Sequence, residues 1–130
     1  MKINVIAVGK KMPDWISRGI EHYKKQLPKH YNFTITTLES QSRKSISADN
    51  AKNLEEKLIL DAASESTLLI AFDELGRQQT SKEISKSIEK WQLDGENVAL
   101  IIGGADGLST QLKKKCNQLW SLSNLTLTHS

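Results

Sequence analysis

The sequence predicts an α/β protein with a mostly parallel five-stranded sheet and helices on both of its faces. Three observations support this class: strand-like and helix-like segments alternate along the 130 residues, two strand-like segments are apolar on both faces, and glycine or proline punctuates the chain between segments. Alternation of this kind favours parallel strands that are joined by right-handed crossovers. A chain of this length predicts a single domain over residues 1–130.

The first third predicts a strand, a helix and a second strand. Residues 2–8 are rich in β-branched side chains and stop at Gly9. Pro13 suits the first turn of a helix, whose apolar residues recur at spacings of three and four as far as Pro28. Residues 32–38 alternate apolar and polar side chains, which predicts a half-buried strand.

The middle of the chain predicts a loop, a helix and a central strand. Residues 40–47 have no apolar residue before Ile46 and indicate an exposed loop, and a helical period of apolar residues follows from about Ala48 to Ala63. Residues 67–73 are almost continuously apolar, as is typical of a parallel strand covered on both faces. We expect residues 74–79 to form a loop at the carboxyl end of this strand.

The last third predicts two helices and two strands. Thr80 followed by Glu83 is a capping-box signature for a helix that ends at the Asp94-Gly95 turn. Residues 97–102 form a second strand that is apolar on both faces. The apolar spacing of residues 112, 116 and 119 predicts a last helix, and residues 121–127 alternate as a fifth strand.

Composition excludes several classes of protein. The 38% hydrophobic and 25% charged fractions are typical of a soluble globular chain, and no apolar run is long enough to span a membrane. The N-terminus has no small-residue cleavage site and Cys116 has no cysteine to pair with, so we expect a cytoplasmic protein. The three scattered histidines predict no metal centre, and the net charge of +3 permits a nucleic-acid partner without requiring one.

The segment after the last central strand is the most informative candidate site. Open parallel sheets bind ligands at the carboxyl ends of their strands. Gly103 and Gly104 follow such a strand, and the lack of two Cβ atoms would let a flat ligand such as an adenine approach the main chain. The alternative is a tight turn in which Ser109 caps the next helix. The segment is neither a dinucleotide-binding fingerprint nor a P-loop.

Acid/base and nucleophilic chemistry have little support. Asp73 and Glu74 are adjacent carboxylates, but neighbouring residues of a strand point to opposite faces, so a shared-proton pair is disfavoured against a solvated strand end. No serine lies in a G-x-S-x-G motif, which argues against covalent hydrolysis.

Aromatic and basic residues leave two interpretations open. Trp15, Trp91 and Trp120 occupy apolar positions, which favours buried anchors over stacking on a nucleic-acid base. Arg43 and Lys44, together with the lysines at 113–115, could meet phosphates, although each also suits a solvated face.

Four motifs resemble the RlmH family of SPOUT-class methyltransferases, which act on a pseudouridine of large-subunit ribosomal RNA. In order, they are AVGKKMPDW at residues 7–15, WQLDG at 91–95, IGGADGLS at 102–109 and WSLSNLTL at 120–127. The resemblance runs from residue 1 to about residue 129. It implies a deep trefoil knot, which periodicity could not reveal because knots are rare exceptions to normal threading.

The resemblance also implies a function. It predicts methyl transfer from S-adenosyl-L-methionine to N3 of a pseudouridine in the ribosome, by a homodimer whose site lies near the interface. The residues that match the family's cofactor site are Phe72, Gly103, Gly104, Leu122, Ser123, Asn124, Leu125, Thr126 and Leu127. A sulfonium methyl donor is already activated, so the protein mainly has to position donor and acceptor and help remove the N3 proton.

The end of the sequence departs from the family pattern. Relatives continue with Pro-His and a C-terminal helix, whereas here Thr128 replaces the proline and His129 precedes the final Ser130. His129 is the catalytic candidate, and the other catalytic residues stay unknown. One alternative is a truncated, inactive homologue that only dimerises or binds cofactor or RNA weakly. Another is a flavodoxin-like domain that binds a phosphate with residues 103–107.

Overall fold

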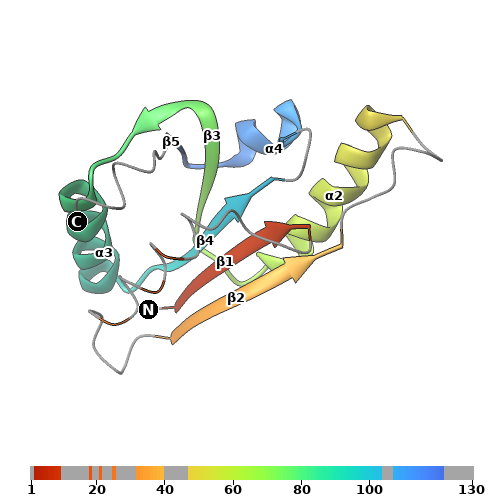
Figure 1. Cartoon of the computed structure of the whole chain (residues 1–130). Helices are drawn as coiled ribbons and strands as arrows, with labels where there is room; N and C mark the ends of the chain where they lie inside the picture. Colours follow the sequence, from red (N-terminus) through yellow and green to blue (C-terminus); the bar gives the residue numbers. More distant parts are fainter. Residues whose placement is uncertain are drawn as a thin grey trace.

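Five parallel strands form the centre of the described part of the protein. The computed structural model describes residues 2–9, 18, 21, 25, 32–39, 47–103 and 107–121. The strands are β1 (Lys2–Val8), β2 (Asn32–Leu38), β3 (Leu68–Gln78), β4 (Asn97–Ile102) and β5 (Gln118–Ser121), and the helices are α2 (Ala48–Ala62), α3 (Ser81–Asp94) and α4 (Thr110–Lys115) (Figure 1). The strand order is β2-β1-β4-β3-β5, and every pairing is parallel. This confirms the predicted α/β class.

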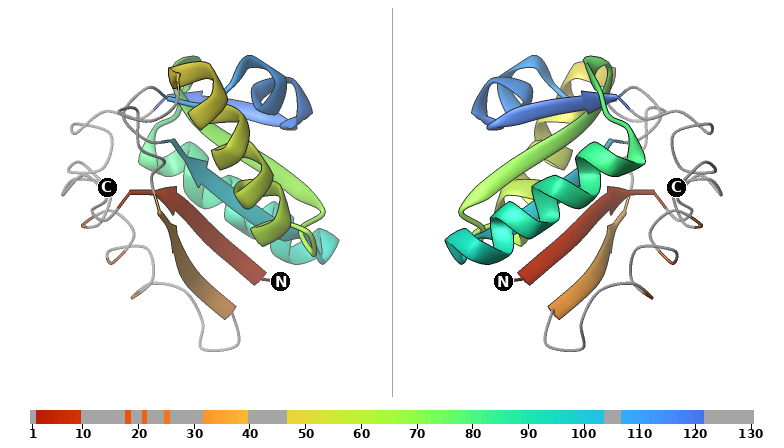
Figure 2. Two further views of the ribbon diagram at one scale, coloured as in Figure 1. Left: turned by 90° about the vertical axis from the view of Figure 1, so that its right-hand side faces the viewer. Right: turned by 90° about the vertical axis from the view of Figure 1, so that its left-hand side faces the viewer.

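The helices cover both faces of the sheet, with α2 and α3 on opposite sides (Figure 2). On one face, Ile59 of α2 and Leu112 of α4 pack in a cluster with Ile6 of β1. On the other face, Trp91 of α3 packs in a cluster with Ile3. Alternate residues of β1 therefore enter two different core layers, which explains why this strand needs apolar residues at successive positions.

Local signals in the sequence locate most elements correctly. The expected strands at residues 2–8, 32–38 and 97–102 are present with those bounds. Thr80 and Glu83 form the capping box of α3, and Gly95 ends that helix in the left-handed region with φ of 67°. Ser47 caps α2 by accepting a hydrogen bond from the Asn50 N–H.

The loop that we expected at residues 74–79 is wrong. The structure extends β3 as far as Gln78, because the chain pairs with β5 a second time after an irregular stretch. Phe72 lies opposite Trp120, and Arg77 lies opposite the same residue. The four residues between them form a bulge, which alternation of apolar and polar residues does not reveal.

The last predicted helix is too long, and the last strand begins earlier than expected. Helix α4 ends at Lys115, so Cys116 and Leu119 are not on its face. Asn117 starts the pairing with β3: its N–H donates to the Leu69 carbonyl at 2.8 Å, and its Oδ1 accepts from the Leu69 N–H at 2.8 Å. Long-range bonds of this kind override the local apolar period.

Several expectations fall outside the described residues. In the predicted helix after Pro13, only Arg18, Glu21 and Lys25 are described, and all three are helical and exposed. Residues 40–46 of the loop predicted at 40–47 and residues 122–127 of the last predicted strand are not described, so the trefoil knot stays a prediction. None of the helices in the described residues is both long enough and apolar enough to cross a bilayer.

Candidate functional site

At one edge of the sheet, the carboxyl ends of β4 and β5 lie on either side of the middle of β3, at Phe72. Phe72 of β3 pairs with Ile102 of β4 on one side and with Trp120 of β5 on the other. Gly103 follows Ile102 directly in the sequence, and residue 122 lies two positions beyond Trp120. The register thus brings Phe72 and Gly103 close to the end of β5. In the sequence, β5 is followed by residues 122–127, the predicted cofactor-binding segment. The other predicted site residues lie outside the described part: Gly104, Leu122, Ser123, Asn124, Leu125, Thr126, Leu127 and His129.

A group of aromatic rings holds this edge together. The half-buried Phe72 ring lies 6.4 Å from the Trp120 ring, centroid to centroid. Trp120 in turn stacks on Trp91 of α3, with centroids 5.8 Å apart and an angle of 15° between the ring planes. Trp91 and Trp120 are 5% and 2% exposed, so both are the buried anchors that the sequence predicted. Trp15 is not described.

Gly103 is required by close packing within its own loop. A Cβ at this position would lie 2.8 Å from the main-chain carbon of Gly107 and 2.9 Å from Cγ of Leu108. Gly107 itself has a φ of +74°, which favours glycine. Ser109 then caps α4 by accepting from the Leu112 N–H at 3.1 Å, and it donates to Glu56 at 2.6 Å. The predicted Ser109 cap is therefore confirmed, whereas residues 104–106 of the predicted turn lie outside the described part of the chain.

Gly76 is a residue of this edge that the sequence reasoning missed. A Cβ on Gly76 would lie 2.7 Å from the carbonyl carbon of Leu119 and 2.8 Å from that of Trp120. The main chain of β3 therefore presses directly on the main chain of β5 where the bulge returns to the sheet. The available signal was a glycine within the polar stretch after a central strand, but only the β3–β5 register shows what it contacts.

Asp73 joins β3 to α4. Its carboxylate accepts from the Lys113 ammonium at 3.4 Å and from the Leu75 N–H at 3.1 Å. The side chains of Asp73 and Lys113 are 16% and 26% exposed. The expected solvated strand end is therefore wrong for Asp73, because β3 continues and α4 packs against it. These contacts indicate a structural ion pair.

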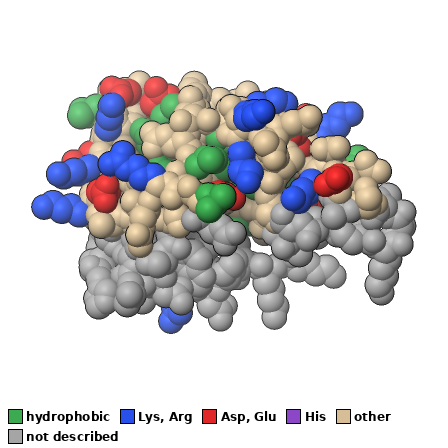
Figure 3. Space-filling view, turned by 90° about the horizontal axis from the view of Figure 1, so that it is seen from above, with side chains coloured by type: hydrophobic (Ala, Val, Ile, Leu, Met, Phe, Trp, Pro, Cys, Tyr) green, Lys and Arg blue, Asp and Glu red, His purple; other side chains and the backbone are tan. Residues whose placement is uncertain are grey.

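The described basic side chains lie among acidic ones. Lys115 is 3.7 Å from Glu56, so two of the three lysines at the end of α4 have a carboxylate partner. Seen from above in Figure 3, the described Lys and Arg side chains lie beside Asp and Glu across this face. Arg43 and Lys44 lie outside the described residues. The charges visible on this face do not form an isolated basic stripe of the kind that marks a nucleic-acid footprint.

Among the described residues, the carboxyl of Glu83 and the thiol of Cys116 depart from their ordinary pKa. Hydrogen bonds with Thr80 lower the pKa of the Glu83 carboxyl, with a smaller contribution from Arg77, which lies 3.8 Å away. Burial raises the pKa of the Cys116 thiol. Among the residues that the structure describes, no three His, Cys, Asp or Glu side chains gather as a metal site requires.

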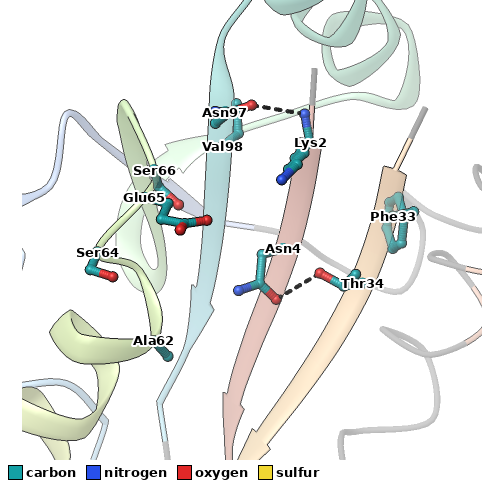
Figure 4. A pocket seen from close by; sticks show the side chains of 10 residues that line it. All are labelled: Lys2, Asn4, Phe33, Thr34, Ala62, Ser64, Glu65, Ser66, Asn97 and Val98. Atoms are coloured by element: carbon teal, nitrogen blue, oxygen red, sulfur yellow. Dashed lines mark hydrogen bonds between the residues drawn. The ribbon is translucent and has the colours of Figure 1, made fainter. Parts of the chain in front are cut away.

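A cavity of about 560 Å³ lies away from this edge, at the amino ends of the strands (Figure 4). Lys2 and Asn4 of β1 and Asn97 of β4 line it, together with Ser64 and Glu65 from the turn after α2. The strands run from this cavity toward the edge with Phe72 and Gly103. The cavity is therefore a separate feature from the candidate site.

Comparison with known families and proteins gives matches over 99–100% of this chain. The family model described as "Predicted SPOUT methyltransferase" matches residues 1–130. A protein of Methylobacillus flagellatus named "Ribosomal RNA large subunit methyltransferase H" is 40% identical over 130 residues, which cover 99% of this chain and 83% of that protein. A protein of the same name from Paraburkholderia phytofirmans is 37% identical over 131 residues, which cover 100% of this chain and 84% of that protein.

A solved structure supports the same fold. The structure of a "probable methylase family protein" from Haemophilus influenzae is similar to this one with a TM-score of 0.52 and 14% sequence identity. The match covers 93% of this chain and 55% of that one. At this identity the likeness establishes the shared fold.

Proposed function

Since the chain belongs to the SPOUT methyltransferase family, we propose that it transfers a methyl group from S-adenosyl-L-methionine to large-subunit ribosomal RNA. The acceptor that we propose is N3 of a pseudouridine. The family match and the names of two relatives at 37–40% identity support methylation of ribosomal RNA, and the resemblance of the four motifs supports the donor and the acceptor atom.

The single observation that carries the proposed site is the register of β4, β3 and β5. It aligns Ile102, Phe72 and Trp120 across three neighbouring strands; the glycine loop follows Ile102 in the sequence, and Trp120 begins the WSLSNLTL motif. Ligands of open parallel sheets bind at this end of the strands. The close packing at Gly103 and the aromatic contact of Phe72 give this edge a defined shape, which suits a ligand that must be oriented.

We propose that Phe72, Gly103, Gly104 and residues 122–127 hold the donor. The half-buried Phe72 offers an apolar contact, and the main chain after β4 and β5 offers hydrogen-bonding groups. When bound, the donor supplies an activated methyl group. The chain's own task is to keep the acceptor nitrogen in line with that methyl group and to accept the N3 proton.

His129 is the candidate for the proton acceptor. It follows the proposed donor-binding segment by two residues. An imidazole suits this task because its ordinary pKa lies near neutrality, so the neutral form that accepts a proton is available.

We further propose that the protein acts as a homodimer with the ribosome, and therefore in the cytoplasm. The resemblance of the motifs implies that the site lies near a dimer interface. The described edge of β5 is short, at four residues, and it leads directly into the segment that would complete the site.

Two measurements test the proposed function. Isothermal titration calorimetry should detect binding of S-adenosyl-L-methionine, and ribosomes from a strain that lacks the modification should take up a radioactive methyl group from it. Mapping should place the label on N3 of a pseudouridine. Donor binding without any transfer would instead favour an inactive homologue, and a copurifying flavin together with no donor binding would favour the flavodoxin-like alternative.

A further inference from the structure

The cavity at the amino ends of the strands has the size and the polar groups of a ligand site. Its volume of about 560 Å³ falls within the range of about 300–1,000 Å³ that is usual for small-molecule sites. In Figure 4 its walls are the starts of β1, β2 and β4 and the turn that follows α2. The groups that line it come from segments far apart in the sequence, so the fold assembles them.

Asn4 is held in one orientation. Its Oδ1 accepts hydrogen bonds from Oγ1 of Thr34 at 3.1 Å and from Oγ1 of Thr36 at 2.9 Å. The amide oxygen is thus saturated from β2, and the NH₂ group points into the cavity (Figure 4). Within the described residues this NH₂ group has no acceptor. A donor fixed in this way suits a carbonyl oxygen of a ligand.

Asn97 has a similar arrangement on the next strand. Its Oδ1 accepts from the Lys2 main-chain N–H at 3.1 Å, so its NH₂ group is again the free end of the side chain in the described part of the chain. The cavity thus contains two amide donors whose oxygens are already committed to neighbouring strands.

Two opposite charges face the same space without pairing. In Figure 4 the Lys2 ammonium and the Glu65 carboxylate both extend toward the region in front of Asn4. No ion pair joins Lys2 and Glu65 within the described residues. A ligand that satisfies both must present an anionic group to Lys2 and hydrogen-bond donors to Glu65.

We propose that this cavity binds a ribonucleotide unit. Its phosphate lies at Lys2, its ribose hydroxyls donate to Glu65, and a carbonyl of its base accepts from the Asn4 amide. A carboxylate that accepts from ribose hydroxyls is a recurrent way to recognise the sugar. A free amino acid would match the two charges, but it would leave most of the volume and both amide donors unused.

The same chemistry can come from a free nucleotide or from a nucleotide within RNA. The second source rests on the proposed function, because ribosomal RNA would then contact the protein at both ends of the sheet. The first source is independent of methyl transfer.

Uridine 5′-monophosphate is the probe, because its base carries two carbonyls. It is titrated into the ¹⁵N-labelled full chain, with the Asn4 and Asn97 side-chain amides observed by NMR. Parallel titrations use uridine, the 2′-deoxy nucleotide, inorganic phosphate and a uridine-containing oligoribonucleotide. We expect saturable shifts of both amides with the nucleotide, and weaker binding of the deoxy form and of uridine. Tighter binding of the oligoribonucleotide would identify RNA as the source, whereas equal or weaker binding would identify the free nucleotide.

Asn4→Asp is the decisive variant. The carboxylate keeps an acceptor for Thr34 and Thr36 but removes the NH₂ donor, so we expect about tenfold weaker binding of uridine as well as of its monophosphate. Asn50→Asp makes the same chemical change at an exposed position outside the cavity and should leave both affinities unchanged. Lys2→Met should weaken the monophosphate and leave uridine unaffected.

Three outcomes would overturn the proposal: no saturable shift at millimolar uridine 5′-monophosphate, equal binding to the Asn4→Asp and unchanged proteins, or shifts that inorganic phosphate alone reproduces in full. Each variant is first compared with the unchanged protein by its NMR spectrum, so that loss of folding is recognised. None of these titrations involves the methyl donor. Their failure would therefore leave the proposed methyl transfer intact, and failure of methyl transfer would leave the nucleotide site intact.

Discussion

Gly76 of β3 lies against the main chain of Trp120 in β5, so closely that a Cβ on Gly76 would be 2.8 Å from the Trp120 carbonyl carbon. Phe72 and Arg77, the two residues that flank the bulge of β3, both lie opposite Trp120. The bulge is therefore closed at both ends against one buried residue. Because Phe72 belongs to the proposed donor site, this contact links the packing of β5 to the shape of that site.

Gly76→Ala should destabilise the protein by about 1–3 kcal/mol, because main-chain atoms cannot turn away from an added methyl group as a flexible side chain can. Urea unfolding measures the change in the free energy of unfolding. Leu75→Ala is the matched control: the Leu75 side chain is 86% exposed, so its truncation should change stability by less than about 0.5 kcal/mol. Equal stability of the Gly76→Ala and unchanged proteins would contradict the close approach.

Phe72→Ala should weaken binding of S-adenosyl-L-methionine roughly tenfold, since a large apolar contact is lost at the proposed donor site. Calorimetry on folded protein measures the affinity. Leu93→Ala lies in the WQLDG motif but is 86% exposed, and it should bind the donor normally. Unchanged affinity of the Phe72→Ala protein would remove Phe72 from the site.

His129→Gln should lower methyl transfer by about 100-fold or more while the donor still binds, as expected when a proton acceptor is lost. The rate of transfer to unmodified ribosomes and the donor affinity are measured on the same protein. His22→Gln makes the same change outside the four motifs and serves as the control. A parallel loss of donor affinity would show that His129 acts in binding instead.

The ion pair of Asp73 with Lys113 should contribute roughly 0.2–1 kcal/mol to stability, because both side chains keep some contact with water. A double-mutant cycle with Asp73→Asn and Lys113→Met isolates the interaction. Unfolding in urea, with and without added salt, provides the measurement. A coupling energy of zero would mean that the pair does not join β3 to α4 in solution.

The capping box of α3 should make stability depend on acid pH. The Thr80 N–H donates to Glu83 at 3.2 Å, and the hydrogen bonds with Thr80 hold the folded-state pKa of Glu83 below its ordinary value of 4.5. The charged carboxylate therefore stabilises the fold fully above that ordinary value, and this contribution is lost as the pH falls through the lower folded-state pKa.

Comparison of Glu83→Gln with the unchanged protein, by thermal unfolding over a pH series, tests this sign. The difference in stability should be present near neutral pH and should close in acid. A difference that widened in acid would contradict the lowered pKa. The exposed Glu89→Gln offers a control on the same helix.

Sequence reasoning succeeded where neighbouring residues decide the structure. The Thr80–Glu83 capping box, the left-handed Gly95 and the doubly apolar strand at residues 97–102 depend on local hydrogen bonds and on the period of burial. It failed around residues 112–119, where an apolar period of helical spacing continued past the true end of α4. There the bonds between Asn117 and Leu69, 48 residues apart, outweigh local preference.

The candidate site likewise has features that the sequence shows and features that depend on contacts between distant segments. A glycine pair after a buried strand was visible in the sequence, and so was the WSLSNLTL motif. The role of Gly76 was not, because it depends on contact with a strand that follows more than 40 residues later. Likewise, nothing in the order of residues showed that Lys2, Glu65 and Asn97 line one cavity.

By itself the sequence determined the α/β class, most helix and strand bounds, and the family to which the motifs point, since side-chain periodicity, caps and ordered motifs are properties of short segments. Only the tertiary structure decided that Phe72 lies between Ile102 and Trp120, that β3 bulges and pairs twice with β5, and that the cavity forms at the opposite end of the sheet. The physical reason is that strand register and cavity walls arise from contacts between segments that are distant in the chain. The free energy of such a contact depends on both segments, so neither segment alone determines it.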